Sequence, residues 1–332
     1  MSPRQRLLTA GVLLAAALSA GLFAFRQERQ VEPPSPVVEV PAPVPTQVRP
    51  PAVAVHVPPQ PRPAPARPEV HLVVPPAPDT TALREDLPVQ LVETRFGRTS
   101  LAMLRGGLPV SRHVLWRSSV GQFIREAGAV AGVNGTFFKD AAIASNDSNM
   151  LGPMLTPDGK FLSETDPVQL KKIAGRPLVA WSRGSFLVTA FDPESMNHKS
   201  QVEALLPGMT DAFLAGAWLV HGGQALTLKQ MQVHAPKDAQ EVRPRVFFGV
   251  TKAGLVIAGA TISPVSSARL AVIAEHYGAE EAVLMDSGYS TSLIYGTRAL
   301  AVGHPSRKVQ SRPVPHAIVF MNPVALLLPH KP

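Results

Sequence analysis

A carboxylate, a glycine and several hydroxyl groups follow one apolar segment near the end of the chain. Asp286, Gly288, Ser290 and Thr291 come directly after residues 282–285, which we expect to form a buried strand. A strand end that opens into a loop is a place where a rigid scaffold presents reactive groups. Asp286 is therefore a candidate reactive carboxylate. The alternative is an Asx turn in which Asp286 only caps its own loop, and the sequence leaves both interpretations open.

A second polar turn follows the short apolar segment 130–133. Asn134 and Gly135 begin this turn, and phenylalanines follow at positions 137 and 138. An asparagine at a strand end can hydrogen-bond a ligand, but Asn-Gly is also the commonest hairpin turn. Paired phenylalanines are more often core residues than a platform for a ligand. The turn is thus a candidate binding element, with a purely structural role as the alternative.

Basic residues gather in two places around these turns. The residues concerned are Arg243 and Arg245 at the start of an expected strand, and Arg298, His304, Arg307, Lys308 and Arg312 after Asp286. Arginine binds phosphate through two parallel hydrogen bonds, so such a cluster suits a phosphate group. A solvated basic loop is the alternative, and it is favoured for Arg307 and Lys308.

Several other chemistries are disfavoured by the residues present. The chain has no cysteine, which removes disulfides, thiolate zinc sites and cysteine nucleophiles. The segment 288–292 lacks the closing glycine of a nucleophile elbow. The segment 146–149 lacks the central glycine and distal glutamate of a calcium loop. The histidines at 221, 234, 304 and 316 show no metal-ligand spacing, so no cofactor is predicted and a divalent metal is left open.

The elements that must position these residues are mostly strands with few helices. The expected strands are 130–133, 178–181, 185–191, 245–250, 255–260, 282–285 and 316–321, and the expected helices are 119–127 and 264–277. Arg183-Gly184 and the turn 251–254 predict two hairpins. Ser263-Pro264 fits a helix N-cap followed by proline, and Gly278 fits a helix stop. Strands and helices mix without strict alternation, which favours a single α+β domain with a mixed sheet.

The N-terminal quarter of the chain predicts export and a linker. Residues 1–30 read as a signal peptide or signal anchor, because Arg4 and Arg6 precede the uncharged segment 7–25, about 28 Å of helix. Seventeen of the 35 prolines lie between Pro33 and Pro78, so 31–86 is expected to be a disordered proline-rich linker. The globular domain is expected at 87–325, with a tail at 326–332. We expect this domain to lie outside the cytoplasm, anchored to the membrane or secreted after cleavage.

The net charge of +8 lies mainly in the C-terminal part, since residues 91–332 carry a net +7. A basic surface favours an anionic partner such as a phosphate-bearing sugar or an anionic glycan. The export segment and the absence of a basic-aromatic motif argue against nucleic acid.

The order of these motifs resembles the phosphodiester glycosidase family over residues 89–323. That family has an Asn-Gly-Gly-Phe-Phe-like motif, a later Leu-Asp-Gly-Gly-Gly-Ser motif and a closing Arg-x-Val motif. The matching segments here are 134–138, 152, 158–159, 215–223, 245–249, 278–279, 285–290 and 312–314. The order and spacing of the motifs are more specific than any motif alone.

The resemblance implies a hydrolase that cleaves the bond between a sugar's anomeric carbon and a phosphodiester oxygen. A phosphate leaving group is stable as an anion, so it needs charge stabilisation more than a strong acid. The implied catalytic residues are Asp286 as base or nucleophile, Asn134 as a ligand to sugar or phosphate, and His221 as a proton donor. The implied substrate-binding residues are Arg243, Arg245, Gly288, Tyr289, Ser290, Thr291 and Arg312. Candidates for a second carboxylate are Asp140, Glu241 and Glu275.

Three departures from the family pattern carry an alternative function. Thr136, Ser287 and Tyr289 stand where the family has glycine, which permits positive φ or close approach of substrate. Tyr289 narrows the pocket or stacks on a sugar in the catalytic interpretation. The alternative is a non-catalytic envelope module that binds an anionic glycan.

Overall fold

The computed structural model describes residues 80–139, 149–235, 241–306 and 308–323, all within the compact unit Leu72–Pro332. The expected membrane segment at 7–25, the tail at 326–332 and most of the expected linker lie outside the described residues. Within the described ranges, no helix is long and apolar enough to span a membrane.

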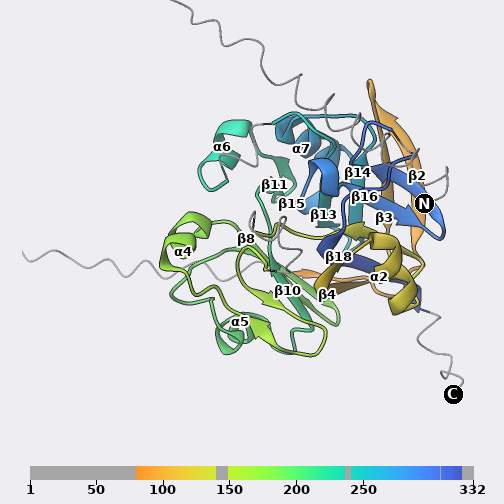
Figure 1. Cartoon of the computed structure of the whole chain (residues 1–332). Helices are drawn as coiled ribbons and strands as arrows, with labels where there is room; N and C mark the ends of the chain where they lie inside the picture. The colour runs from red at the N-terminus through yellow and green to blue at the C-terminus, as the bar shows by residue number, and fades with distance from the viewer. Residues whose placement is uncertain (1–79, 140–148, 236–240, 307, 324–332) are drawn as a thin grey trace, which may run out of the picture. The chain divides into compact units, whose positions relative to one another are not determined.

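Three antiparallel sheets form the framework of the described chain (Figure 1). The first sheet has the order β1 (Thr80–Ala82), β9 (Ser185–Ala190), β8 (Pro177–Ser182), β10 (Asp211–Leu214), β6 (Met154–Leu155) and β7 (Phe161–Leu162). The second sheet has the order β12 (Gln224–Ala225), β11 (Trp218–His221), β15 (Ala279–Leu284), β13 (Val246–Thr251), β14 (Val256–Thr261), β3 (Thr99–Arg105) and β2 (Gln90–Phe96). The third sheet has the order β17 (Arg298–Val302), β16 (Ser292–Tyr295), β5 (Ala131–Asn134), β18 (Val314–Met321) and β4 (Leu108–Ser118).

Short helices accompany the sheets. They are α2 (Val120–Ala127), α4 (Pro167–Ile173), α5 (Lys199–Leu205), α6 (Leu228–Gln232), α7 (Ser267–His276) and the 3-10 turn η1 (Gly288–Ser290). The expected predominance of strands over helices is confirmed. The expected mixed sheet is wrong, because every strand pair among the described residues is antiparallel. Many neighbouring strands follow one another through short turns, which can join only antiparallel strands.

Both predicted hairpins form. Gly184 in the β8–β9 turn has a φ of +79°, and Gly254 in the β13–β14 turn has a φ of +78°. A residue without a Cβ atom adopts this left-handed conformation at no steric cost, so these turns are encoded locally.

The prediction that α7 begins at Pro264 is wrong. Val265 exchanges backbone hydrogen bonds of 2.9 and 3.2 Å with Arg243, so the chain is still paired in an extended form there. The N-cap is Ser266, whose Oγ accepts a hydrogen bond from the backbone N–H of Arg269 at 3.2 Å. A serine followed by a proline fits a cap locally, but the pairing of Val265 delays the helix by three residues.

A central apolar cluster joins all three sheets. Trp181 of β8 lies 5.5 Å from Phe248 of β13 between ring centroids, and Phe248 lies 6.5 Å from Phe320 of β18. Phe186 and Phe213 of the first sheet pack against the same rings. All five side chains are at most 1% exposed, so the three sheets share one core.

The helices bury the remaining faces of the sheets. α7 packs against β11, β12 and β15 of the second sheet, and α2 packs against β5, β16 and β18 of the third. A separate cluster includes Ile173 of α4 and Val202 of α5 with apolar residues of the first sheet. The loops after β5 and β15 are thereby held at the meeting of the second and third sheets.

Candidate active site

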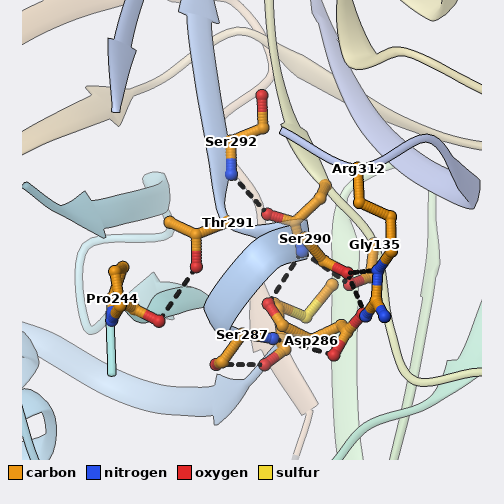
Figure 2. A network of polar contacts seen from close by, with 10 residues as sticks. Gly135, Pro244, Asp286, Ser287, Ser290, Thr291, Ser292 and Arg312 are labelled. Carbon is orange, nitrogen blue, oxygen red and sulfur yellow. Dashed lines mark hydrogen bonds and ion pairs between the residues drawn. The ribbon is translucent and has the colours of Figure 1, made fainter. Parts of the chain in front are cut away.

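The loop after β15 presents Asp286 with only 6% of the residue exposed. Asp286 Oδ1 accepts a hydrogen bond from the backbone N–H of the adjacent Ser287 at 2.8 Å, whereas an Asx turn would take the N–H of residue 288, which donates to the oxygen of Pro244 instead. Asp286 Oδ2 lies 3.2 Å from Arg312 Nη2 (Figure 2). One carboxylate oxygen therefore shapes the loop, and the other belongs to a charged cluster.

Asn134, at the end of β5, ties this loop to its neighbours. Its Nδ2 donates to the backbone oxygen of Asp286 at 2.8 Å, and its Oδ1 accepts from the N–H of Ser292 at 2.9 Å. The N–H of Asp286 also donates to the oxygen of Gly135 at 3.1 Å. Asn134 is fully buried, so its amide positions the backbone of Asp286. The Asn-Gly pair does not make a hairpin, since β5 pairs with β16 and β18.

Arg312 reaches two groups of the Asp286 loop with one side chain. Its Nε and Nη2 donate to Ser290 Oγ at 2.9 and 2.6 Å, and Nη2 also contacts the Asp286 carboxylate (Figure 2). Its backbone N–H donates to the oxygen of Tyr289 at 2.8 Å. The structure thus brings Asp286, Ser290 and Arg312 into one contact network.

A second arginine, Arg117, contacts the ring of Phe138 together with Arg312. The sequence motifs did not indicate Arg117 as a site residue. Arg312 Cζ is 5.0 Å from the centre of the Phe138 ring, and Arg117 Cζ is 5.8 Å from the same centre. Arg117 belongs to β4, where the register with β18 shifts so that residues 113–118 oppose only 314–316. This irregularity places Arg117 near the Asp286 loop, and no local motif in the sequence predicts it.

A pocket of about 640 Å³ opens beside this cluster. Its lining residues are Glu241, Val242, Arg243, Pro244, Ile262, Ser263, Pro264, Ser287, Gly288, Tyr289, Val302, Gly303, His304, Pro305 and Arg312. Four of the predicted site residues are among them: Arg243, Gly288, Tyr289 and Arg312. Tyr289 is 63% exposed, and its ring lies 6.1 Å from that of His304. Glu241 forms an ion pair with Arg243 at the pocket wall.

Gly288 and Thr291 hold the loop to the strand opposite it. The N–H of Gly288 and Oγ1 of Thr291 both donate to the oxygen of Pro244, each at 2.9 Å. Gly288 has a φ of +65°, which favours glycine, so this family glycine is needed by the backbone. Thr291 is fully buried and therefore serves the loop rather than the pocket.

The structure does not bring Arg245 to the pocket. Arg245 is 1% exposed, and its guanidinium donates to the backbone oxygens of Val265, at 3.4 Å, and of Glu241. Its backbone N–H donates to Thr261 Oγ1 at 3.0 Å. Arg245 thus supports the segment that carries Glu241 and Arg243. The side chain points inward because Arg245 directly precedes β13, a fully buried strand.

His221 also lies away from Asp286. Its Nδ1 is 2.9 Å from Glu281, which also accepts from the indole N–H of Trp218 at 2.8 Å. Glu281 and Asp286 are five residues apart, about 16 Å along an extended chain. His221 therefore sits near the opposite end of β15 from the candidate site.

The two candidate second carboxylates within the described residues, Glu241 and Glu275, lie in different places. Glu241 lines the pocket, whereas Glu275 of α7 accepts a hydrogen bond from the N–H of Ala225 at 3.1 Å. Asp140 and Arg307 lie outside the described residues. Of the basic residues, Arg298 is paired with Glu93 at the surface, at 2.7 Å. No group of three His, Cys, Asp or Glu side chains that could hold a metal occurs within the described ranges.

The buried side chain and backbone of His316 hold the turn that follows Asn134. The N–H of Gly135 donates to the backbone oxygen of His316 at 2.7 Å, and the N–H of Thr136 donates to His316 Nδ1 at 3.0 Å. Burial lowers the pKa of His316 to about 3, so the ring is neutral, and Nε2 donates to Ser111 Oγ at 2.8 Å. The N–H of Ser111 donates to Asp211 at 2.7 Å, and burial raises the pKa of Asp211 to about 6. The sequence did not indicate this network, because its members lie far apart in the chain.

The phosphodiester glycosidase family model matches residues 127–321, more than half of the chain. The chain therefore belongs to the phosphodiester glycosidase family, as its motifs predicted. No curated protein sequence matches it.

Two solved structures share the fold. One is the catalytic domain of zebrafish N-acetylglucosamine-1-phosphodiester α-N-acetylglucosaminidase, auto-inhibited by its pro-peptide. Its TM-score is 0.55 at 11% identity, over 73% of this chain and 87% of that one. The other is a hypothetical protein from Synechocystis, with a TM-score of 0.51 at 13% identity, over 70% of this chain and 61% of that one. At these identities the likeness is one of fold.

Proposed function

We propose that this chain hydrolyses the bond between the anomeric carbon of a sugar and an oxygen of a phosphodiester. The observation that carries the proposal is the contact network of Asp286, Ser290 and Arg312 beside the pocket. Membership of the phosphodiester glycosidase family supports the same reaction class. A carboxylate beside an arginine matches what the reaction needs, a group that acts at the anomeric carbon and a cation that stabilises the departing phosphate.

The roles we assign follow the positions of the side chains. Asp286 acts as base or nucleophile, and Arg312, with Arg243 at the pocket wall, binds the phosphate. Ser290 orients Arg312 through its hydroxyl, and the exposed ring of Tyr289 stacks on the sugar. In the overall reaction the bond from carbon to the phosphate oxygen breaks, and water supplies the new hydroxyl of the sugar. The phosphate departs as a monoester.

We place Asn134 and Thr291 in a positioning role, since their side chains bond backbone groups of the loops. His221 and Arg245 are left out of the proposed catalytic set because they lie away from the pocket. The pKa of Asp211 is raised, but this group lies in the supporting network rather than in the pocket.

The test is sugar release by the full-length protein and its Asp286→Asn variant, incubated with UDP-N-acetylglucosamine and related UDP-sugars. We expect free sugar from the parent and a loss of at least about 100-fold in the variant, the usual effect of removing an acid–base group. Asp86→Asn is the matched control, because Asp86 is an exposed aspartate paired with Arg84. Absence of release by a folded parent with every sugar would instead support the glycan-binding module.

The location of the domain is a separate proposal, which rests on residues 7–25. We propose that residues 1–30 direct export and that the domain at 87–325 works outside the cytoplasm, on a phosphate-bearing glycan. Fusion of a periplasmic reporter enzyme after residue 332 tests this, with deletion of residues 1–30 as the control. Reporter activity that survives this deletion would contradict the proposal.

A further inference from the structure

A second cavity, of about 1000 Å³, is lined in part by Phe138, whose ring contacts Arg312 of the first pocket. Its lining residues are Phe137, Phe138, Lys139, Leu151, Asp166, Gln169, Lys171, Lys172, Ile173, Ala174, Gly175, Arg176, Val233 and His234. The ring of Phe138 forms part of this wall and also lies against the guanidinium of Arg312. Phe138 is therefore the residue through which the second cavity and the Arg312 wall of the first pocket are linked.

The lining of the second cavity is strongly cationic. Four lining side chains carry a positive charge: Lys139, Lys171, Lys172 and Arg176. The carboxylate among the described lining residues is Asp166, and its Oδ1 caps α4 by accepting from the N–H of Val168 at 2.9 Å. Lys139 is paired with Glu164 at 3.1 Å, whereas Lys171 and Lys172 are exposed side chains in the last turn of α4 and contribute positive potential at the cavity.

Two features show that the side chains lining the second cavity are held in place by packing. Arg176 is 9% exposed, so its guanidinium is held within the wall and not in bulk solvent. Gly175 has a φ of +78°, and a Cβ atom there would lie 2.2 Å from His234 Nδ1. The imidazole of His234 can therefore pack against the backbone only because residue 175 is glycine. The imidazole of His234 and the guanidinium of Arg176 both belong to this lining.

We infer that the second cavity binds the aglycone of the phosphodiester substrate, and that this aglycone carries a further anionic group such as a second phosphate. The inference rests on the proposed function, which places the scissile phosphate at Arg312. It names the substrate class as a glycosyl phosphodiester with a polyanionic aglycone. Cations in a concave site raise the local concentration of an anion and orient it. A polyanionic aglycone would therefore account for the lysines of the second cavity in addition to the arginines of the first pocket.

The first test measures binding of inorganic tripolyphosphate to the full-length protein by calorimetry at low salt. Lys171→Glu with Lys172→Glu is expected to weaken binding at least 10-fold. The matched control is Lys160→Glu with Lys252→Glu, which changes the net charge equally at exposed positions outside the second cavity. Equal weakening by both pairs would overturn the inference, because it would show only a general effect of net charge.

The second test compares two phosphodiesters of one sugar, with either a methyl or a phosphoethyl aglycone. The Lys171→Glu/Lys172→Glu variant is expected to lose at least 10-fold in kcat/KM on the phosphoethyl substrate and to keep its rate on the methyl one. Equal loss on both substrates would overturn the inference. Failure of the parent to cleave either diester would contradict the proposed function. The tripolyphosphate measurement would still show whether the second cavity binds a polyanion. Two controls exclude misfolding as the cause of a loss. Thermal unfolding compares the stability of the variant with that of the parent, and the milder Lys171→Gln/Lys172→Gln variant is expected to show the same loss to a smaller extent.

Discussion

The guanidinium of Arg312 lies 3.2 Å from the carboxylate of Asp286, although the two residues are 26 positions apart in the chain. The same guanidinium donates twice to Ser290 Oγ, so the planar group is held in one orientation. Nη2 alone contacts both groups, and the fork of the guanidinium adds the second hydrogen bond, from Nε to Ser290, which the single nitrogen of a lysine cannot supply. The pair therefore joins the group that would act on the sugar to the group that would stabilise the phosphate.

Arg312→Lys is expected to lower kcat/KM by about 100-fold, the effect of losing one preorganised charge-stabilising donor. The charge is kept, but the hydrogen bond from Nε to Ser290 is lost, and with it the fixed orientation of the cation. Steady-state sugar release with a phosphodiester substrate measures this. Arg298→Lys is the control, since Arg298 is an exposed arginine paired with Glu93. An Arg312→Lys variant with parental kcat/KM would show that the fork is not used.

Tyr289→Ala is expected to raise KM about fivefold, because stacking of an aromatic ring contributes about 1 kcal/mol. The ring is 63% exposed, so the free energy of unfolding should change by no more than about 0.5 kcal/mol. Tyr289→Phe keeps the stacking face and should retain the parental KM. If Tyr289→Ala has the parental KM, stacking on the sugar is contradicted, and Tyr289 only narrows the pocket.

Asp211→Asn is expected to change how stability depends on pH. The pKa of Asp211 is about 6 in the folded protein, above its value of about 3.9 in an unfolded chain. The folded state therefore holds the proton more tightly. The stability from this group is fully present below pH 4 and is lost as the pH rises through 6, by about 3 kcal/mol in all. Asparagine cannot ionise, so the variant should gain about 3 kcal/mol over the parent between pH 4 and pH 7.

Urea unfolding at pH 4, 5, 6 and 7 measures this difference. His316 acts in the opposite direction, since its folded pKa of about 3 lies below the unfolded value. Its contribution is present above about pH 6.5 and is lost as the pH falls toward 3. Because His316 is present in both proteins, the difference between them isolates Asp211. A difference that is flat across this range would contradict the prediction.

Gly135→Ala is expected to destabilise the fold and to reduce activity. A Cβ atom at this position would lie 2.1 Å from His316 Nδ1, so the turn that holds Asp286 must shift. Gly121→Ala in α2 is the matched control, because its Cβ would make only ordinary contacts of 3.6 Å or more. The control should gain about 0.5–1 kcal/mol from the better helix residue. Thermal unfolding of both variants, with sugar release, checks the contrast. Equal stability in the two variants would refute it.

The local parts of the fold could be predicted from the sequence. The hairpins at Gly184 and Gly254 form where predicted, because turn residues fix them without help from distant parts of the chain. The start of α7 could not be predicted, because it depends on the pairing of Val265 with Arg243, 22 residues earlier. Antiparallel pairing throughout was likewise not evident, since strand direction depends on which segments meet.

The candidate site was predictable only in outline. Asp286 and Arg312 were recognised from their motifs, and the structure places them together. The motif that contains Arg245 gave no indication that its side chain is buried beneath the pocket segment. Arg117 could not be found from the sequence, because an irregularity in strand register brings it to Phe138.

The register shift in β4 also bears on association between copies of the chain. β4 is an edge strand of the third sheet, a position that exposes backbone groups to other strands, but the oxygen of Pro109 and the N–H of Ser111 already bond Trp181 and Asp211 of the first sheet. Its bulged segment carries Leu115 and Trp116, which are 78% and 71% exposed, and its other end carries Pro109, which has no N–H to donate. An incoming strand would find the ladder interrupted at both ends. The distortion that places Arg117 therefore also protects an apolar edge from strand-to-strand aggregation.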